Sequence, residues 1–237
     1  MMDREELLIK GSTELNKMFA ALQRTAQGLR RDFGEVENLQ QSLRSAQDFV
    51  NKAAARIEES ILSDLLLVRP SAGLLTPNVS HSGEGRDEFV LSLSGAANFV
   101  RANGHFAISL ALRTMDETKI ALVYSPIEEK LYYAEAGRGA YAFSAFRSAR
   151  IKVSNLSEKS ELTVAYNGNH APIGGNIRQT GCPALDMAWV AAGKLDAYIS
   201  DALDYAEVAA AELLIREAGG TLSMDMDLIA TNGKVSV

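Results

Sequence analysis

The hydrophobic period of the chain changes after Gly73, and this change constrains the fold more than any other feature. Before it, apolar residues recur every three or four positions; after it they alternate, as in Phe106, Ile108, Leu110 and Leu112. Spacing by three and four is typical of one helix face, and alternation is typical of a strand with one buried face. The sequence therefore predicts helices followed by a sheet.

Two helices are predicted before the change. The first extends from about residue 3 to 31 with a break near Gly11-Ser12, and the second covers residues 50–68 and ends before Pro70. Proline ends a helix because it lacks an N–H donor and its ring clashes with the preceding turn. We expect the polar segment between them, residues 35–49, to form a short hairpin.

The alternating region predicts a mostly antiparallel sheet. Turn residues such as Ser125-Pro126 and Gly137-Arg138-Gly139 separate its strands. The expected strands are 88–93, 106–112, 120–124, 131–134 and 150–153.

Strands and helices alternate in the last third of the chain. The expected strands are 162–166, 196–199 and 221–224, and the expected helices are 184–192 and 204–218. Glycine follows both helices, where a positive φ is needed at low cost. Such alternation predicts layered α/β packing. We expect one compact α/β unit in two parts, residues 1–154 and 161–237.

Composition favours a folded protein of the cytoplasm. Among 237 residues, 47% are hydrophobic and the net charge is -6, without a run of Lys and Arg. Nucleic-acid binding is therefore not expected, because phosphate contacts need clustered cations. The single cysteine, Cys182, cannot form an internal disulfide. No stretch approaches the roughly 20 apolar residues of a membrane span.

The segment from Leu91 to Val100 resembles a phosphatase signature. Enzymes similar to inositol monophosphatases carry Asp-Pro-Ile/Leu-Asp-Gly-Thr/Ser-x-Asn-Phe here, and Gly95, Asn98 and Phe99 keep that register. Further blocks resemble the family in the same order: Asp48-Phe-Val-Asn-Lys-Ala-Ala, 104–112, Gly137-Arg-Gly-Ala, 178–198 and 206–220. This resemblance implies the layered α/β sandwich of that family.

The resemblance places neutral residues where the family has its catalytic groups. Family members hydrolyse phosphate esters with Mg²⁺ held by carboxylates, which activates a water molecule. The metal positions here read Ala54, Asn78, Leu91 and Ser94, and the hydroxyl that helps to orient the water is replaced by Ala96. The resemblance therefore implies a degenerate catalytic site.

Glu207, at the family's last metal position, is the one acid that remains. A hard dication prefers six or more oxygen ligands, and Leu91 would remove one and add an apolar obstruction. We therefore expect no family-type metal site and no cofactor.

The substrate side of the family's site is altered as well. Cys182, Pro183 and Ser200 replace a small Ser or Thr, an Ala and a Glu, and Pro183 removes a backbone donor. The backbone at Gly95-Ala96 and Gly181-Cys182 remains as a candidate ligand-binding element, because helix N-termini bind anions.

Other acids offer a rebuilt Mg²⁺ site as an alternative. Glu207 could be joined by Asp204, Asp201, Glu84 or Glu88 if their oxygens converge. Simpler interpretations are that Asp204 caps the following helix and that residues 84–88 form a solvated loop.

Cys182 could also act as a nucleophile with His81, His105 or His170 as its base. This interpretation is less favoured, because Cys182 replaces a small residue and His105 falls on an expected buried strand.

We interpret the chain as a catalytically inactive member of that family, a pseudophosphatase that binds a protein partner or a small ligand. The alternatives are an active Mg²⁺-dependent phosphomonoesterase with a rebuilt site, and a metal-free binder of phosphate ligands. The resemblance also implies a homodimer, and we expect no association with membranes.

Overall fold

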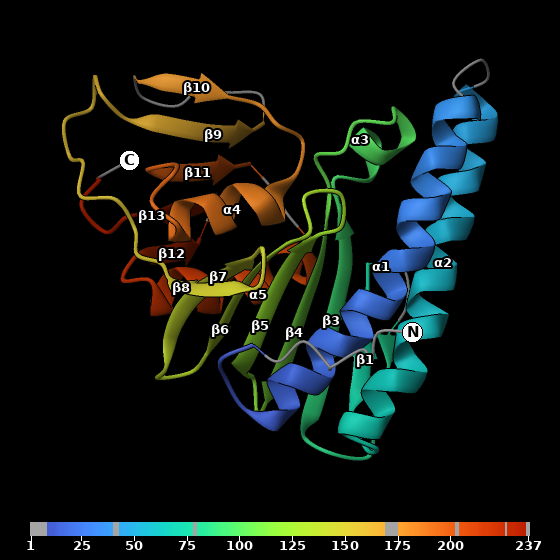
Figure 1. The fold of residues 1–237 in the computed structure, drawn as a ribbon. Helices are drawn as coiled ribbons and strands as arrows, with labels where there is room; N and C mark the ends of the chain where they lie inside the picture. Colours follow the sequence, from blue (N-terminus) through green and yellow to red (C-terminus); the bar gives the residue numbers. More distant parts are fainter. Residues whose placement is uncertain are drawn as a thin grey trace.

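Two long helices, α1 and α2, lie side by side on one face of a large sheet (Figure 1). Helix α1 (Thr13–Leu39) begins after Ser12, whose hydroxyl accepts a hydrogen bond from the Leu15 N–H at 3.1 Å. Such a side chain satisfies one free donor of the first turn. Residues 9–12, which the sequence predicts to be helical on either side of the break, are not in a helix, and residues 3–8 lie outside the described residues. Helix α2 (Leu43–Val68) ends before Pro70. This computed structural model describes residues 9–39, 43–77, 80–168, 175–201, 204–225 and 227–235.

The large sheet has eight strands in the order β2-β1-β3-β4-β5-β6-β7-β8. Neighbouring strands are antiparallel except β1 and β3, which are parallel. A short helix, α3 (Ala96–Val100), follows β3. The strands are β1 (Gly73–Leu75), β2 (Ser80–His81), β3 (Asp87–Ser94), β4 (Ala107–Thr114), β5 (Glu117–Ser125), β6 (Lys130–Glu135), β7 (Gly139–Ser144) and β8 (Arg147–Arg150).

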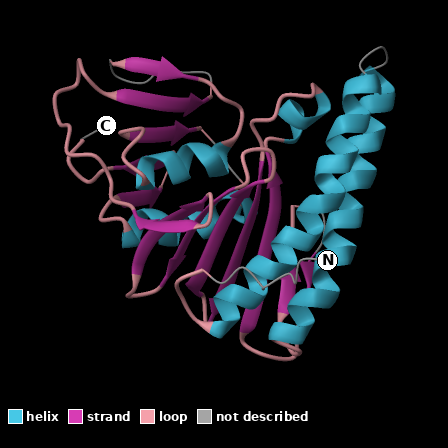
Figure 2. Ribbon diagram, in the orientation of Figure 1, coloured by secondary structure: helices cyan, strands magenta, loops and turns pink. Residues whose placement is uncertain are grey.

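A second sheet of five strands, in the order β10-β9-β11-β13-β12, forms the other outer layer. Helices α4 (Pro183–Ala191) and α5 (Tyr205–Glu217) lie between the two sheets, since α5 contacts β3 to β7 and α4 contacts both α5 and β11 (Figure 2). The fold is therefore the layered α/β sandwich that the sequence predicts. The strands are β9 (Thr163–Asn167), β10 (Asn176–Arg178), β11 (Ala197–Ser200), β12 (Thr221–Met224) and β13 (Leu228–Thr231).

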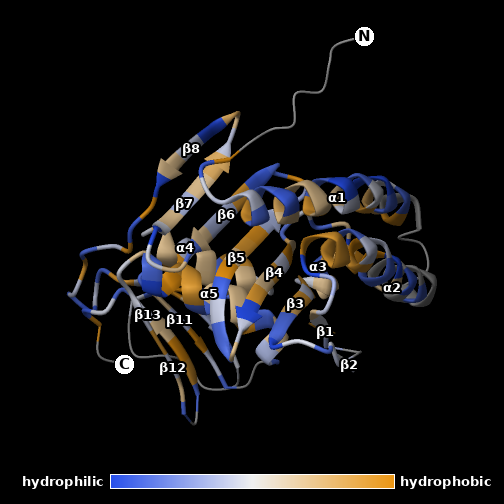
Figure 3. Ribbon diagram, turned by 90° about the horizontal axis from the view of Figure 1, so that it is seen from below, coloured by the Kyte–Doolittle hydropathy of each residue, from blue (hydrophilic) through white to orange (hydrophobic). Residues whose placement is uncertain are grey.

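Side chains of β3 alternate between two hydrophobic cores. Phe89 and Leu91 pack in the core beneath α1 and α2, whereas Val90 packs in the core around α4 and α5. Successive side chains of a strand point to opposite faces, so each face of the large sheet has its own core. Figure 3 shows hydrophobic colouring on β5, whose side chains enter both cores, and on α5, which lies in the second core.

The expected hairpin at residues 35–49 is wrong. Helix α1 continues past the predicted end at residue 31 to Leu39, and α2 begins at Leu43 and not at residue 50. Val36 is fully buried, and the Arg56 guanidinium lies 2.8 Å from the buried Asp32 carboxylate on the neighbouring helix. Contacts between the two helices thus stabilise a segment whose polar composition favours a turn.

The expected strand at 150–153 is also displaced. Strand β8 ends at Arg150, and Val153 instead donates its N–H to the Ala218 carbonyl at the end of α5. The short strands β1, β2, β7, β10 and β13 were not expected, because few of their residues alternate in hydrophobicity.

Two tight hairpin turns place non-glycine residues at positive φ. Met115 (φ 50) and Asp116 (φ 66) join β4 to β5, and Ala145 (φ 47) and Phe146 (φ 62) join β7 to β8. Turns of this kind match the twist of the strands, but they favour Asn and Gly because a bulky side chain is strained there. Phe146 is 79% exposed, so burial does not offset its strain.

Across the described ranges, no helix combines the length and apolar character that crossing a bilayer requires.

Candidate functional site

Strand β3 ends at Ser94, where the chain turns sharply into α3. Gly95 makes this turn with φ 81, and a Cβ added there would lie 3.0 Å from the His105 carbonyl oxygen and 3.1 Å from the Cys182 Cβ. Both the positive φ and the close contacts favour glycine. The turn therefore brings β3 against the segment that precedes α4.

The Asn98 side chain fixes this contact. Its amide nitrogen donates to the His105 carbonyl at 2.7 Å and to the Thr180 carbonyl at 2.8 Å. Gly181, next to Thr180, has φ 76 and lies against the same side chain. Asn98 thus joins the signature segment to the start of α4.

The Ser94 hydroxyl is completely buried and joins β3 to α4. It accepts a hydrogen bond from the Ala184 N–H at 3.1 Å, which satisfies a donor in the first turn of that helix. The Cys182 thiol donates to the Ser94 carbonyl at 3.5 Å. Ser94 is therefore part of the packing between two elements.

Glu207 lies in the first turn of α5 and faces the same region. Burial raises the pKa of its carboxyl, the charge of Asp204 raises it further, and a hydrogen bond with Ser94 opposes the shift. Asp204 caps α5, since its carboxylate accepts the Ala206 N–H at 2.9 Å, which confirms the capping interpretation.

A second buried acid, Asp186 of α4, was not singled out from the sequence. It accepts a hydrogen bond from the Thr180 hydroxyl at 2.7 Å, and its other oxygen is buried without a partner. Burial raises the pKa of its carboxyl to about 7. A single acid on an otherwise apolar helix is the signal that could have identified it.

Asp186 and Glu207 also affect the pKa of two neighbouring buried groups, Cys182 and Tyr198. Burial raises the pKa of the Cys182 thiol to about 12, and both carboxylates add to this effect. Burial also raises the pKa of the Tyr198 hydroxyl, again with a contribution from both acids. The site therefore contains several buried groups that favour their neutral, protonated forms.

A family model described as "Inositol monophosphatase family" matches residues 12–227. The chain belongs to the inositol monophosphatase family. An inositol-1-monophosphatase of Mesorhizobium japonicum is 34% identical to it, over 91% of this chain and 86% of the relative. The Nus factor SuhB of Escherichia coli K12 is 29% identical, over 88% and 84%. The crystal structure of the extragenic suppressor protein suhB from Bartonella henselae matches with a TM-score of 0.82 and 29% identity, over 94% and 95%.

Among the positions that the resemblance assigns to the metal, Ser94 and Glu207 lie together, but Leu91 points to the other face of the sheet. Leu91 is 1% exposed and packs beneath α1 and α2, whereas Ser94 bonds to α4 on the opposite side of the sheet. Ala54 lies in α2 with its side chain outside the described residues, and Asn78 lies outside them altogether. At the described positions, the apolar Leu91 and the neutral, already bonded Ser94 do not fit the oxygen set that Mg²⁺ prefers.

The acids of the proposed rebuilt site are dispersed. Glu88 pairs with Arg113 at 3.0 Å near the start of β3, about 20 Å along the strand from Ser94. Glu84 is exposed in a turn, and Asp201 accepts a hydrogen bond from the Tyr166 hydroxyl at 3.3 Å. Across the described ranges, no three His, Cys, Asp or Glu side chains are grouped as a metal site.

The geometry gives no support to a nucleophilic Cys182. Its thiol is buried and bonded to Ser94, and a thiol with a raised pKa is a poor nucleophile. His105 precedes β4 and is not on the strand as expected; its ring lies 5.0 Å from that of Trp189. The side chain of His81 and the whole of His170 lie outside the described residues.

Proposed function

We propose that this inositol monophosphatase family member binds a protein partner or a small ligand, and does not hydrolyse phosphate monoesters by the family's Mg²⁺ chemistry. One observation carries the proposal: Ser94 stands where the resemblance implies a metal carboxylate, and its hydroxyl is used to hold the first turn of α4. A neutral group engaged in packing supplies no charge for a metal.

The size of the chemical barrier supports this proposal. Hydrolysis of phosphate monoesters needs accelerations of up to about 10²¹-fold, which is roughly 28 kcal/mol of barrier reduction. The family's metal supplies charge neutralisation and an activated water molecule. Glu207, partly buried and with a raised pKa, is a weak replacement for a full set of carboxylates.

The names of the relatives are compatible with a role other than hydrolysis. Several relatives that are 28–29% identical are called Nus factor SuhB, a name that describes a factor and no phosphatase. Function depends on sites and not on the fold, so membership in the family does not by itself require hydrolysis.

An active Mg²⁺-dependent phosphomonoesterase is the second candidate. It is favoured by relatives named inositol-1-monophosphatase at 34% identity and by the electrostatic coupling of Asp204 to Glu207. A metal-free binder of phosphate ligands at Gly95-Ala96 and Gly181-Cys182 is a third, but α3 has only five residues and so a weak dipole.

The test compares hydrolysis of inositol 1-phosphate and p-nitrophenyl phosphate by the wild type and by Glu207→Gln, with and without Mg²⁺. We expect equal, metal-independent background rates, because both proteins lack the ligand set. Glu207→Gln is the matched control, since a contaminating phosphatase would act in both preparations. Hydrolysis that requires Mg²⁺ and falls at least tenfold in Glu207→Gln would refute the proposal in favour of the second candidate.

A direct measurement of metal binding complements the assay. We expect calorimetric titration with Mg²⁺ at neutral pH to give no binding heat at concentrations up to the low millimolar range. Binding in that range would support the rebuilt site.

The family resemblance also supports a homodimer. Analytical ultracentrifugation of the full chain would measure this, and a mass that stays at 25.6 kDa at all concentrations would contradict it.

A further inference from the structure

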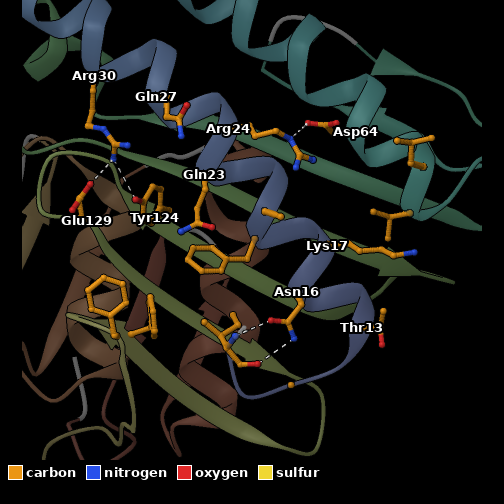
Figure 4. A pocket seen from close by; sticks show the side chains of 18 of the residues that line it. Thr13, Asn16, Lys17, Gln23, Arg24, Gln27, Arg30, Asp64, Tyr124 and Glu129 are labelled. Atoms are coloured by element: carbon orange, nitrogen blue, oxygen red, sulfur yellow. Dashed lines mark hydrogen bonds and ion pairs between the residues drawn. The ribbon is translucent and has the colours of Figure 1, made fainter. Parts of the chain in front are cut away.

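A large groove runs along α1 on the side of the molecule opposite to Ser94 and Glu207. It has a volume of about 1110 Å³. We refer to it as the α1 groove; Asn16, Gln23 and Gln27 of the helix line it, together with Tyr124, Phe143 and Phe146 from the sheet. Figure 4 shows the labelled α1 side chains along the helix, with Tyr124 and Glu129 across from Arg30.

The α1 groove has an aromatic floor. The Phe19 ring lies 5.7 Å from that of Phe143 and 6.0 Å from that of Tyr124, in both cases edge to face. Phe146 stands at the rim in its strained turn and is 79% exposed. Leu67 of α2 also lines the groove and is 77% exposed, so two large exposed apolar side chains border it, as is typical of a contact surface.

The groove carries an excess of positive charge although the chain has a net charge of -6. Its two acids are both paired: Asp64 lies 2.9 Å from Arg24, and Glu129 lies 3.1 Å from Arg30. Lys17 also lines the groove and forms no ion pair with any described residue. The local charge is thus opposite in sign to that of the whole protein.

Two further cations border the same surface. Lys10 follows Ile9, which lines the groove, and its ammonium lies 5.4 Å from the Tyr141 ring. Arg147 follows Phe146 and is exposed, with no carboxylate partner among the described side chains. Lys17 in the lining, with Lys10 and Arg147 next in the chain to lining residues, would attract an acidic partner.

The dimensions of the groove match a helix. Its α1 residues extend from Thr13 to Arg30, which is about 25 Å at 1.5 Å per residue. Parallel or antiparallel helices pack about 8–10 Å apart, so a helix beside α1 would lie over the strands that carry Phe143 and Phe146.

We propose that the α1 groove docks an acidic amphipathic helix of a protein partner. The apolar side chains of that helix pack on the exposed Leu67 and Phe146, and its carboxylates meet Lys10, Lys17 and Arg147. This inference does not rest on the absence of hydrolysis, because the groove and the Ser94 site lie on opposite faces of the large sheet.

The experiment uses two labelled 18-residue helical peptides with leucine at alternating three- and four-residue spacing. One has glutamate and the other lysine at the remaining positions. We expect the acidic peptide to bind saturably by fluorescence polarisation, to shift the backbone amide resonances of α1 and the β7–β8 turn, and to bind at least tenfold more tightly than the basic peptide. Equal binding of the two peptides, shifts located elsewhere, or no saturation below about 1 mM would overturn the proposal.

Phe146→Asn tests the role of the exposed aromatic residue without endangering the fold, because asparagine is favoured in this turn. We expect it to weaken binding of the acidic peptide at least tenfold, and Lys17→Glu to weaken it severalfold. Met115→Asn is the control, since Met115 is an apolar residue at positive φ in the other strained turn and is 61% exposed. Unchanged affinity in Phe146→Asn would overturn the proposal.

Two other occupants are distinguished by the same variants. If Phe146→Asn converts a dimer to a monomer in sedimentation, the groove is an interface between copies of this chain and the proposal fails. If neutralising the acids of residues 1–8 with Asp3→Asn, Glu5→Gln and Glu6→Gln tightens peptide binding at least tenfold, the chain's own first residues compete for the groove and the proposal of a separate partner fails.

Discussion

The Ser94 hydroxyl accepts a hydrogen bond from the Ala184 N–H at 3.1 Å, and this bond joins the end of β3 to the first turn of α4. Both residues are fully buried. The first N–H groups of a helix have no partner within the helix, so a buried one needs an acceptor from elsewhere. Ser94 supplies this acceptor, and its small size allows the Cys182 thiol to approach the same point.

Ser94→Ala should destabilise the protein by about 1–3 kcal/mol. The substitution leaves the Ala184 N–H buried without an acceptor, which costs the desolvation free energy of that donor. Urea denaturation followed by circular dichroism measures this loss. Ser223→Ala in the exposed strand β12 is the control and should change stability by less than about 0.5 kcal/mol. Equal stability of the two variants would contradict the structural role of Ser94.

Asp186→Asn should make the stability less dependent on pH. Burial raises the pKa of Asp186 from 3.8 to about 7, so the fold favours its protonated form. The stabilisation is complete below about pH 4 and is lost as the pH rises through about 7. At pH 8 the variant should therefore be more stable than the wild type, by about 4 kcal/mol, and at pH 4 the two should be equal.

Thermal melts from pH 4 to 8 measure this difference. Asn keeps an oxygen that can accept the Thr180 hydroxyl, so the packing is preserved. Asp225→Asn, at an exposed carboxyl, is the control and should leave the pH profile unchanged. A wild-type protein whose melting temperature rises between pH 5 and 8 more than that of Asp186→Asn would refute the assignment.

The sequence predicts the helix pair, most of the large sheet and the strand–helix alternation, because the spacing of apolar residues shows which face of each element is buried. The sequence-based prediction fails at residues 35–49, where Val36 is buried and the neighbouring residues Asp32 and Arg56 join the two helices. It also identifies the segment around Ser94 but not the direction of Leu91, because a motif does not show which face of a strand is buried. Asp186 was missed because its environment depends on contacts across the fold.

Glu217→Gln should destabilise the protein by about 1–3 kcal/mol. The two carboxylate oxygens of Glu217, at the end of α5, accept the N–H groups of Gly137 and Gly139 at 2.7 Å each. An amide has one acceptor oxygen, so one charge-assisted bond is lost and an NH₂ group faces a donor. Chemical denaturation measures the loss. Glu212→Gln on the same helix is the control, because its contact with Arg216 is long, at 3.8 Å, and exposed.

Leu91→Ala should cost about 2–5 kcal/mol, and Leu91→Asp should prevent stable folding. Leu91 is 1% exposed in the core beneath α1 and α2, so truncation leaves a cavity and a carboxylate would be buried without a partner. Urea denaturation of Leu91→Ala and the yield of soluble Leu91→Asp provide the measurements. Leu93→Ala is the control, because Leu93 is only partly buried on the same face and should lose less. A soluble Leu91→Asp variant that binds Mg²⁺ would show instead that this position faces the site.

Mg²⁺ should not stabilise the wild-type protein. A ligand that binds only the folded state stabilises it by about 2.7 kcal/mol at 100 times its dissociation constant, and 1 kcal/mol shifts the melting temperature of a chain of this size by about 2–4 °C. A family-type site would therefore raise the melting temperature by several degrees at saturating Mg²⁺. Because Leu91 is apolar and turned away and Ser94 is already bonded to α4, we expect a shift below about 1 °C in 10 mM MgCl₂ relative to NaCl of equal ionic strength. A rise in melting temperature of several degrees that disappears in Glu207→Gln would establish a metal site at the start of α5. It would then favour the second candidate function, an active Mg²⁺-dependent phosphomonoesterase.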